Sequence, residues 1–310
     1  MSMPTSEGRV TMRSNIFALG LVAGIGFAAT AWAQAQPAQP AAPQRDLLRD
    51  PIREISKIAG EVYRFRNNFH YTVFAVTPAG VIATDPINKG AAEWLKAEIK
   101  SRFNQQVRYL VYSHDHADHI SGGEVFAADG AIVIAHENAK IQVVGEKRPT
   151  AVPQVTFSER MTLELGGSTV ELLYLGKNHS DNTVVMHFPR ERLIFTVDWI
   201  PVQSIAFRDF PDAYIADWID GLRKVEAMDF DILAPGHGPL GNKQSVRDYR
   251  LYMEDLRGQV LKLVREGKSR DEAKQLVDIK KYSAATNFEQ MWQLNIEGMY
   301  NHVTATRRPN

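Results

Sequence analysis

A run of six residues, HDHADH at positions 114–119, constrains this chain more than any other feature of its sequence. It directly follows an apolar segment, residues 107–112, that is predicted to be a buried strand. Where a chain bends at the end of a strand, such side chains can turn their nitrogen and oxygen atoms toward one point. Imidazole and carboxylate are the usual ligands of a catalytic zinc ion where thiolates are absent, and the chain has no cysteine. The motif therefore predicts a metal site.

Three more potential ligands come after predicted strands further along the chain. His179 and Asp198 each follow an apolar run, and His237 follows a third run within a Pro-Gly-His-Gly turn. A single histidine in such a place is more often a capping or packing residue. Four strand ends that all carry metal-ligand side chains, however, predict one shared metal centre.

Short apolar runs separated by turn residues alternate with amphipathic helices over most of the chain. Apolar residues have helical spacing at 89–102 and 212–228, and residues 243–303 are mostly helical in pattern. Strands are predicted at residues 62–65, 71–77, 81–84, 107–112, 131–135, 154–157, 161–165, 169–175, 183–188, 193–196 and 232–234. This mixture fits an α+β fold in which two sheets pack face to face with helices outside.

The predicted domain organisation has four parts. Residues 1–33 are expected to be a signal peptide, and residues 34–50, rich in alanine, glutamine and proline, a flexible linker. Residues 51–240 hold the potential ligands and form the main domain. Residues 241–310 are expected to be a helical extension whose periodic apolar face packs on the same domain, with another subunit as the alternative.

The beginning of the chain has the pattern of an export signal. Arg13 precedes an apolar run at residues 16–30, and Ala31-Trp32-Ala33 supplies the small residues that a signal peptidase needs. We expect cleavage after Ala33 and export to the periplasm. The run is short for a membrane span, which needs about 20 apolar residues, so no stable membrane association is expected after cleavage. A retained N-terminal anchor is the alternative.

The charge balance narrows the range of partners. Lysine plus arginine and aspartate plus glutamate both total 36 residues. No overall field is therefore available to gather nucleic acid or an anionic membrane. The expected partner is a small-molecule substrate, and the sequence favours no particular oligomer.

The motif and its downstream partners resemble the metallo-β-lactamase superfamily. The matching features are His-x-His-x-Asp-His at 114–119, Ser-Gly-Gly at 121–123, His179, Asp198 and Pro-Gly-His-Gly at 235–238. The resemblance covers residues ~55 to 240. It implies the αββα four-layer sandwich of that superfamily, here with additional C-terminal helices.

The resemblance implies a centre for two divalent metal ions, with Zn²⁺ as the expected metal. The implied ligands are, for one ion, His114, His116 and His179, for the other, Asp118, His119 and His237, and as the bridge between them, Asp198. Two dications about 3.5 to 4 Å apart need an anionic bridge and can jointly lower the pKa of a shared water. Manganese, iron and cobalt also accept nitrogen and oxygen ligands, so the metal stays open.

The implied reaction is hydrolysis of an ester, lactone or amide-type bond. A hydroxide that bridges the two metals would be the nucleophile. Asp118 is the predicted catalytic residue, because it could orient that hydroxide and pass on a proton. Asp85, in a Thr-Asp-Pro turn at a strand end, is predicted to hydrogen-bond a ligating histidine and so to support the ligand loop. The alternative is an aspartate that only begins the turn.

Four aromatic residues near the predicted site are candidates for substrate contacts. Phe69 and Tyr71 belong to a hairpin that often overhangs the site as a flap in the superfamily. Trp199 and Phe207 belong to an aromatic segment that would favour an apolar substrate. The alternative for Phe69 and Tyr71 is ordinary packing within the hairpin. For Trp199 and Phe207 it is packing over the edge of the core.

Two other activities stay open within the resemblance. A class B β-lactamase of the cysteine-free type would keep the same histidine and aspartate ligands, whereas the cysteine-containing type is disfavoured because Asp198 stands where it carries cysteine. An iron-dependent persulfide dioxygenase-like enzyme is less favoured, because it uses one iron and fewer ligands. Pro201 stands where related lactonases often have tyrosine, which weakens the lactonase interpretation.

Overall fold

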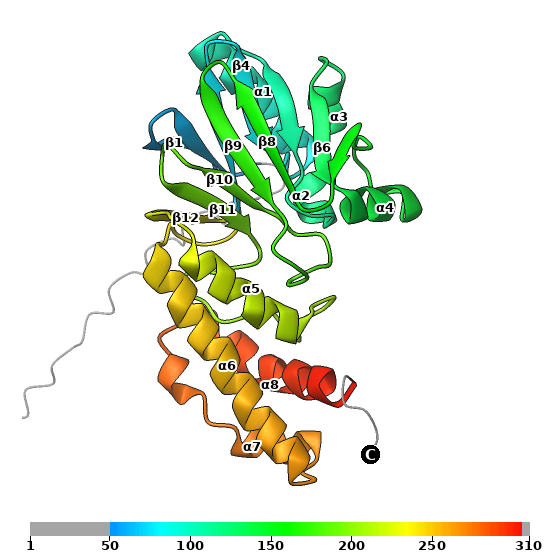
Figure 1. Cartoon of the computed structure of the whole chain (residues 1–310), viewed down its shortest axis with the longest axis vertical. Helices are drawn as coiled ribbons and strands as arrows, with labels where there is room; N and C mark the ends of the chain where they lie inside the picture. Colours follow the sequence, from blue (N-terminus) through cyan, green and yellow to red (C-terminus); the bar gives the residue numbers. More distant parts are fainter. Residues whose placement is uncertain (1–49, 306–310) are drawn as a thin grey trace, which may run out of the picture. The chain divides into compact units, whose positions relative to one another are not determined.

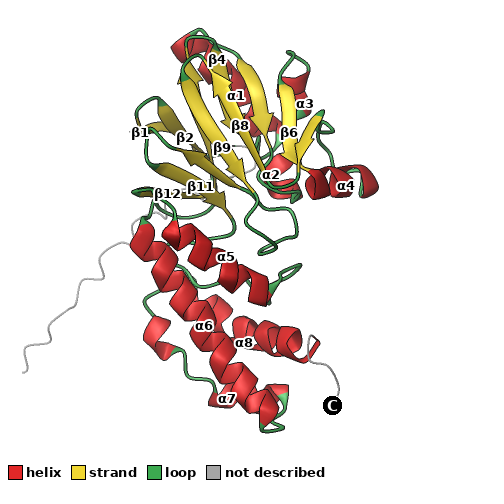
Figure 2. Ribbon diagram, viewed as in Figure 1, coloured by secondary structure: helices red, strands yellow, loops and turns green. Residues whose placement is uncertain are grey.

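The computed structural model describes residues 50–305. The predicted signal peptide at 1–33, and all but the last residue of the predicted linker at 34–50, lie outside the described residues. The described residues belong to one compact unit with two β-sheets and covering helices (Figures 1 and 2).

Seven strands form the first sheet in chain order. They are β1 (Arg53–Ala59), β2 (Val62–Asn67), β3 (His70–Thr77), β4 (Gly80–Thr84), β5 (Val107–Val111), β6 (Ile132–His136) and β7 (Val155–Phe157). The pairs from β1 to β4 are antiparallel and those from β4 to β7 are parallel. β1 is absent from the predicted strands, because this edge strand, REISKIA, is largely polar and half-exposed.

Five strands form the second sheet, in the order β12-β11-β10-β9-β8. They are β8 (Arg160–Leu165), β9 (Ser168–Leu173), β10 (Val185–Phe188), β11 (Leu193–Val197) and β12 (Ile232–Pro235). β11 and β12 are parallel neighbours. Their carboxyl ends therefore meet at one edge of the sheet, which brings the residues that follow them together.

The two sheets pack face to face through one apolar cluster. Val73 and Ala75 of β3 point into this cluster, whereas Phe74 between them points to the opposite face of the sheet. Phe195 and Val197 enter the same cluster from β11. Successive side chains of a strand alternate between faces, so strands that are covered on both sides are apolar at nearly every position.

Helices cover the outer face of the first sheet. They are α1 (Lys89–Phe103), α2 (Ala117–Ile120), α3 (Glu124–Ala127) and α4 (Glu137–Gly145). Asn88 caps the start of α1 by accepting the Ala91 N–H with its side chain, and Asn104 caps its end with a left-handed φ of 50°. Leu95 and Ile99 bury its apolar face against the sheet. α2 and α3 were not predicted because four residues are too few to show a helical repeat. α4 was missed because its apolar residues, buried Ala139 and Val143 and exposed Ile141 and Val144, do not form one face.

The remaining helices form a layer beyond the outer face of the second sheet, and the last two of them pack on other helices of this layer (Figure 1). They are α5 (Ile215–Ala227), α6 (Lys243–Arg265), α7 (Arg270–Leu276) and α8 (Phe288–Ala305), with a 3₁₀ turn at Lys280–Tyr282. Ile194 of β11 and Leu222 of α5 share one apolar cluster with residues of α6 and α8. The helix predicted from residue 212 begins only at Ile215, because Phe210 and Asp212 have φ values of 57° and 60°, which an α-helix does not contain.

Three apolar interfaces thus separate four layers in the order helices, sheet, sheet, helices (Figure 2). This is the αββα sandwich with additional C-terminal helices that the sequence predicts. Within residues 50–305, no helix combines the length and apolar character needed to cross a membrane.

Candidate metal centre

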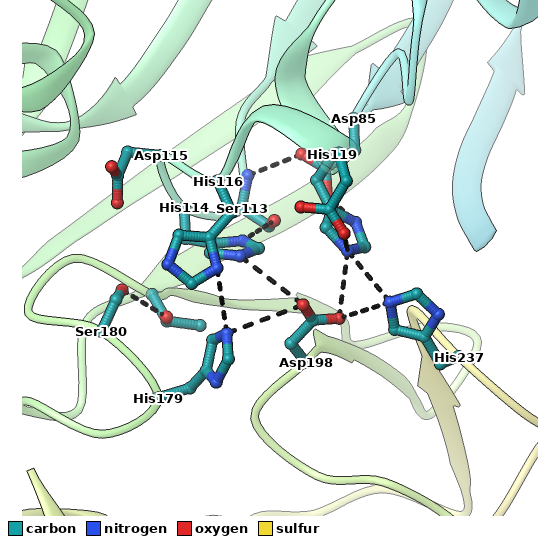
Figure 3. A network of polar contacts seen from close by, with 12 residues as sticks. Asp85, Ser113, His114, Asp115, His116, His119, His179, Ser180, Asp198 and His237 are labelled. Atoms are coloured by element: carbon teal, nitrogen blue, oxygen red, sulfur yellow. Dashed lines mark hydrogen bonds and ion pairs between the residues drawn. The ribbon is translucent and has the colours of Figure 1, made fainter. Parts of the chain in front are cut away.

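The potential ligands lie where strands of both sheets end. The motif at 114–119 follows β5 of the first sheet, and Asp198 and His237 follow β11 and β12 of the second. His179 lies in the connection between β9 and β10. Figure 3 shows the histidines grouped around Asp198. The fold thus brings four separate strand ends together at one site.

The first cluster consists of His114, His116 and His179. Nδ1 of His116 lies 3.1 Å from Nε2 of His179, and the His114 ring lies 4.5 Å from the His116 ring, centroid to centroid. One donor atom from each histidine and one oxygen of Asp198 all lie within 4.8 Å of one another. Three nitrogens and one oxygen so arranged could hold a metal ion.

The second cluster consists of Asp118, His119 and His237. Nε2 of His119 lies 3.2 Å from Nε2 of His237 and 3.6 Å from Oδ2 of Asp118. His119 is fully buried, whereas the side chain of Asp118 is 55% exposed. The second cluster therefore opens toward solvent on its Asp118 side.

Asp198 lies between the two clusters (Figure 3). Its Oδ2 atom is 3.7 Å from Nε2 of His114 and 3.6 Å from Nε2 of His179. Its Oδ1 atom is 3.1 Å from Nε2 of His119 and 3.2 Å from Nε2 of His237. One carboxylate thus offers one oxygen to each cluster, which is the geometry of a bridging ligand.

The backbone around Asp198 is constrained. Val197 has a φ of 44°, a conformation that is sparsely populated by β-branched residues and that is often retained at functional sites. Gly236 lies on the other side of Asp198, and a Cβ atom there would be 3.0 Å from both Asp198 Oδ1 and His119 Cε1. Only glycine lets the β12 loop approach the ligands this closely.

The first cluster suits a metal ion chemically. Among the described residues, Nε2 of His114 is a buried nitrogen with no hydrogen-bond partner, and such an atom is costly unless something binds it. Burial, reinforced by His116, lowers the pKa of His114 well below its usual value. Burial also lowers the pKa of His179 to about 4. Both rings are therefore neutral at pH 7, as metal ligands must be.

The second cluster attracts positive charge. Burial opposes protonation of His119, but Asp198, Asp85 and Asp118 together raise the pKa of this histidine to about 9. Burial also opposes ionisation of Asp198, yet His119 and His237 hold the pKa of this carboxyl well below its usual range. A cation, whether a proton or a metal ion, is stabilised at this position.

Asp85 lies beneath the ligand loop, but the predicted hydrogen bond to a ligating histidine is not formed, since its nearest histidine nitrogen is beyond hydrogen-bond distance. Its Oδ1 atom accepts the Ser113 N–H at 2.8 Å, and its Oδ2 atom is 3.8 Å from Nδ1 of His119. Burial raises the pKa of Asp85 to about 6. Ser113 in turn places its hydroxyl 2.9 Å from Nδ1 of His114. Asp85 therefore contacts the loop at a ligating histidine and at the residue before another.

Asp115 joins the motif to the His179 loop, a role that the sequence analysis missed. The Asn182 side chain accepts the Asp115 N–H and donates to its carboxylate at 2.8 Å. Arg148 donates to the second carboxylate oxygen at 3.0 Å. Asp115 could have been found by its place within the motif, whereas Arg148 carries no signal in the sequence.

The predicted flap lies against the second cluster. The Phe69 carbonyl lies 2.9 Å from Nδ1 of His237, and Tyr71 N donates to the Gly236 carbonyl at 2.8 Å. The Phe69 side chain is 67% exposed, whereas the Tyr71 ring lies under the guanidinium of Arg64. The flap thus holds the His237 loop in place, and substrate contact by these two side chains stays a prediction.

Trp199 does not line the site, so that prediction is wrong. Its side chain is fully buried, and a Cβ atom on Gly221 of α5 would lie 2.5 Å from its ring carbon Cζ2. Trp199 instead packs in the apolar cluster that contains Trp218 and Leu222 of α5. Phe207 on the following loop is 62% exposed, and its contact with substrate stays a prediction.

A polar cavity of about 190 Å³ opens beside the first cluster. His116 lines it together with Asp115, Arg148, Asp212 and Tyr214. Oδ2 of Asp212 lies 3.8 Å from Nε2 of His116. This cavity is a place next to the ligands where part of a small molecule could bind.

Comparisons with known proteins agree with this fold. Residues 87–237 match the family model of the metallo-β-lactamase superfamily. A solved metallo-β-lactamase from Pontibacter korlensis superposes with a TM-score of 0.61 at 21% identity, over 66% of this chain and 99% of that one. The DIM-1 metallo-β-lactamase superposes with a TM-score of 0.59 at 17% identity, over 66% and 99%. The chain belongs to the metallo-β-lactamase superfamily.

Similar curated proteins carry two kinds of name. The alpha subunit of 2,4-dinitroanisole O-demethylase from Nocardioides sp. (strain JS1661) is 28% identical over 66% of this chain and 63% of its own length. The type 2 metallo-β-lactamase of Bacillus cereus is 25% identical over 47% of this chain and 57% of its own length. The matches therefore span less than two thirds of these relatives.

Proposed function

We propose that this protein is a hydrolase that uses two divalent metal ions, with Zn²⁺ as the first candidate, to cleave an ester, lactone or amide-type bond. The observation that carries the proposal is the position of Asp198, whose two oxygens face two separate groups of ligand side chains. Two-metal hydrolytic sites need such an anionic ligand between the ions.

The metal ions would supply an acidified water and polarise the bond to be cleaved. The protein would fix the geometry and orient the water. Burial opposes ionisation of Asp118, but the hydrogen bond from His70 and the nearby His119 lower the pKa of Asp118 to about 2. Asp118 is thus an ionised, solvent-facing carboxylate at neutral pH, suited to orient the attacking water by accepting its hydrogen bond. So low a pKa makes it a weak proton acceptor, because general bases work best with a pKa near the operating pH.

β-Lactam hydrolysis is a specific form of this proposal. A β-lactam is a cyclic amide, and both solved structures and several curated relatives are named metallo-β-lactamases. The O-demethylase name of another relative adds methyl aryl ethers to the substrates worth testing. Ether and amide cleavage would use the same ligands, so only a direct assay separates them.

The experiment is proton release in weak buffer by the zinc-loaded protein. Its panel contains β-lactams, lactones, thioesters, phosphodiesters and 2,4-dinitroanisole. His116→Ala serves as the blank because it removes a ligand of the first cluster. His187→Ala serves as the matched control, because the hydrogen bonds of His187 go to Glu171 and the Asp229 carbonyl, which belong to neither cluster.

Acid release from one class, lost in His116→Ala and kept in His187→Ala, is the expected result, and it would identify the substrate class. No release across the panel, from protein shown to hold two zinc ions, would contradict the proposal. Iron loading and assays with redox substrates would then be the next step.

We also propose that the protein is exported, on the basis of its first 33 residues. The test is the N-terminal sequence of the protein recovered from the periplasm of a Gram-negative host. A mature chain that begins at Gln34 is expected, and Ala33→Leu should block cleavage because the peptidase needs a small residue there. Full-length protein confined to the cytoplasm would contradict the proposal.

A further inference from the structure

The second cluster has a neighbour that belongs to no predicted ligand set. Nε2 of His70, the first residue of β3, lies 3.1 Å from Oδ2 of Asp118. Its ring centroid lies 4.6 Å from that of His237 and 5.3 Å from that of His119. One donor atom from each of these four residues lies within 4.8 Å of the others.

The position of His70 is fixed by its neighbours on both sides. The Phe69 carbonyl bonds Nδ1 of His237 at 2.9 Å, and Tyr71 N bonds the Gly236 carbonyl at 2.8 Å. The hairpin is therefore attached to the β12 loop directly before and directly after His70. With the backbone held in this way, the imidazole has a short path to the second cluster and little freedom to leave it.

The chemistry of His70 also suits coordination, provided that the metal ion takes the place of the proton that Nε2 shares with Oδ2 of Asp118. The His70 side chain is 26% exposed, and its Nε2 atom contacts the solvent-exposed carboxylate of Asp118. Imidazole nitrogen is a common ligand for zinc, and zinc sites can expand to five ligands. With Asp118, His119, His237 and one oxygen of Asp198, a fifth protein donor would be available.

We propose that His70 is a further ligand of the metal ion held by the second cluster. The hairpin between β2 and β3 would then be held to the metal centre by coordination, as well as by its hydrogen bonds to the β12 loop. A protein ligand at this position leaves the second ion fewer open positions, and substrate is directed toward the side of the first cluster and its cavity. The inference rests on the two-metal centre proposed above.

The test measures metal binding rather than hydrolysis, so its failure is distinct from failure of the proposed activity. Zinc content and affinity are measured by chelator competition in the full chain and in His70→Ala, His70→Gln and His187→Gln. Cobalt(II) is then substituted for zinc, because its visible absorption reports ligand number and type at each site. His187→Gln controls for loss of a histidine from another strand.

Two bound ions are expected in the unaltered protein. His70→Ala should keep the first ion, lose at least about tenfold in affinity for the second, and change the cobalt spectrum of that site alone. His70→Gln should behave in the same way, because the amide does not replace an imidazole nitrogen.

Two results would overturn the inference. One is unchanged affinity and an unchanged cobalt spectrum in both variants. The other is loss in His70→Ala with full recovery in His70→Gln, since a glutamine amide can still donate a hydrogen bond to Asp118; His70 would then only position that carboxylate. A single ion in the unaltered protein would refute the two-metal centre itself.

Discussion

The guanidinium of Arg64 lies over the ring of Tyr71, 3.7 Å from the ring centroid. The same guanidinium donates to the carbonyls of Pro235 and Gly238 at 3.1 and 2.7 Å. Those carbonyls flank His237, a candidate ligand in the second cluster. A cation stacked on a flap residue therefore holds the backbone of a ligand loop that lies far away in the sequence.

Replacement of Arg64 by methionine should weaken both the fold and the second metal site. Methionine keeps much of the apolar volume but leaves two carbonyls without their donor, which costs about 1–3 kcal/mol of unfolding free energy. We also expect lower zinc affinity at the second cluster. Urea unfolding and chelator competition measure the two effects.

Arg66→Met is the matched control for Arg64→Met. Arg66 lies two residues further along β2, where it bonds the Asn68 carbonyl and pairs with Glu54 near the surface. Its loss should cost less stability and leave zinc binding unchanged. Equal losses in the two variants would show that Arg64 has no special role in the His237 loop.

Asp198→Asn should weaken the binding of the two metal ions, because it removes the charge that lies between them. The amide is nearly the same size, but it removes the negative charge that lies 3.1 Å from His119 and 3.6 Å from His179. Loss of a residue that supports a ligand costs about 10- to 100-fold in metal affinity, and loss of the bridging charge should cost more. Metal content after dialysis against a weak chelator should fall below two ions per chain.

Asp220→Asn, on the exposed surface of α5, is the control for loss of an aspartate charge. It should retain full metal content. If Asp198→Asn also retains two ions with unaltered affinity, Asp198 does not bridge them.

Asp85→Asn tests the support beneath the ligand loop. The asparagine oxygen can still accept the Ser113 N–H, so the fold should persist, but the carboxylate that faces Nδ1 of His119 is lost. We expect about 10- to 100-fold weaker zinc binding at the second cluster and unchanged binding at the first. Cobalt spectra of the two sites would show the difference. Equal weakening at both would point to a general effect on folding instead.

The grouping of the candidate ligands could be predicted from the sequence because each of them is tied to a strand end. Apolar runs give the strands, and parallel strands such as β11 and β12 bring their carboxyl ends to one edge. Asp198 and His237 therefore meet without any need to know the side-chain packing. The α+β layers follow from the same runs, since they depend on hydrophobic patterning alone.

The supporting residues could not be predicted because they act through tertiary contacts. In the sequence, Arg64 looks like an ordinary strand residue. The carbonyls to which it donates belong to Pro235, at the end of β12 in the other sheet, and to Gly238 just after it. His70 reads as one histidine in a hairpin, and only the pairing of the hairpin with the β12 loop brings it to Asp118. The prediction for Trp199 fails for the opposite reason. Its position next to Asp198 suggests that it lines the site, but its ring is fully buried in the core.

Two helix glycines provide a test of that buried position of Trp199. In α5, a Cβ on Gly221 would lie 2.5 Å from a rigid ring atom of Trp199, whereas in α6 a Cβ on Gly258 would meet no atom within 4 Å. Gly221→Ala should therefore overpack the interface and lower the free energy of unfolding by about 1–3 kcal/mol. Gly258→Ala should raise it by about 0.5–1 kcal/mol, because alanine stabilises a helix interior relative to glycine. Urea unfolding of both variants gives the two values. Opposite signs support the packing of Trp199 under α5, whereas a stabilising effect of Gly221→Ala would mean that the ring lies elsewhere and that Trp199 is again free to face the substrate.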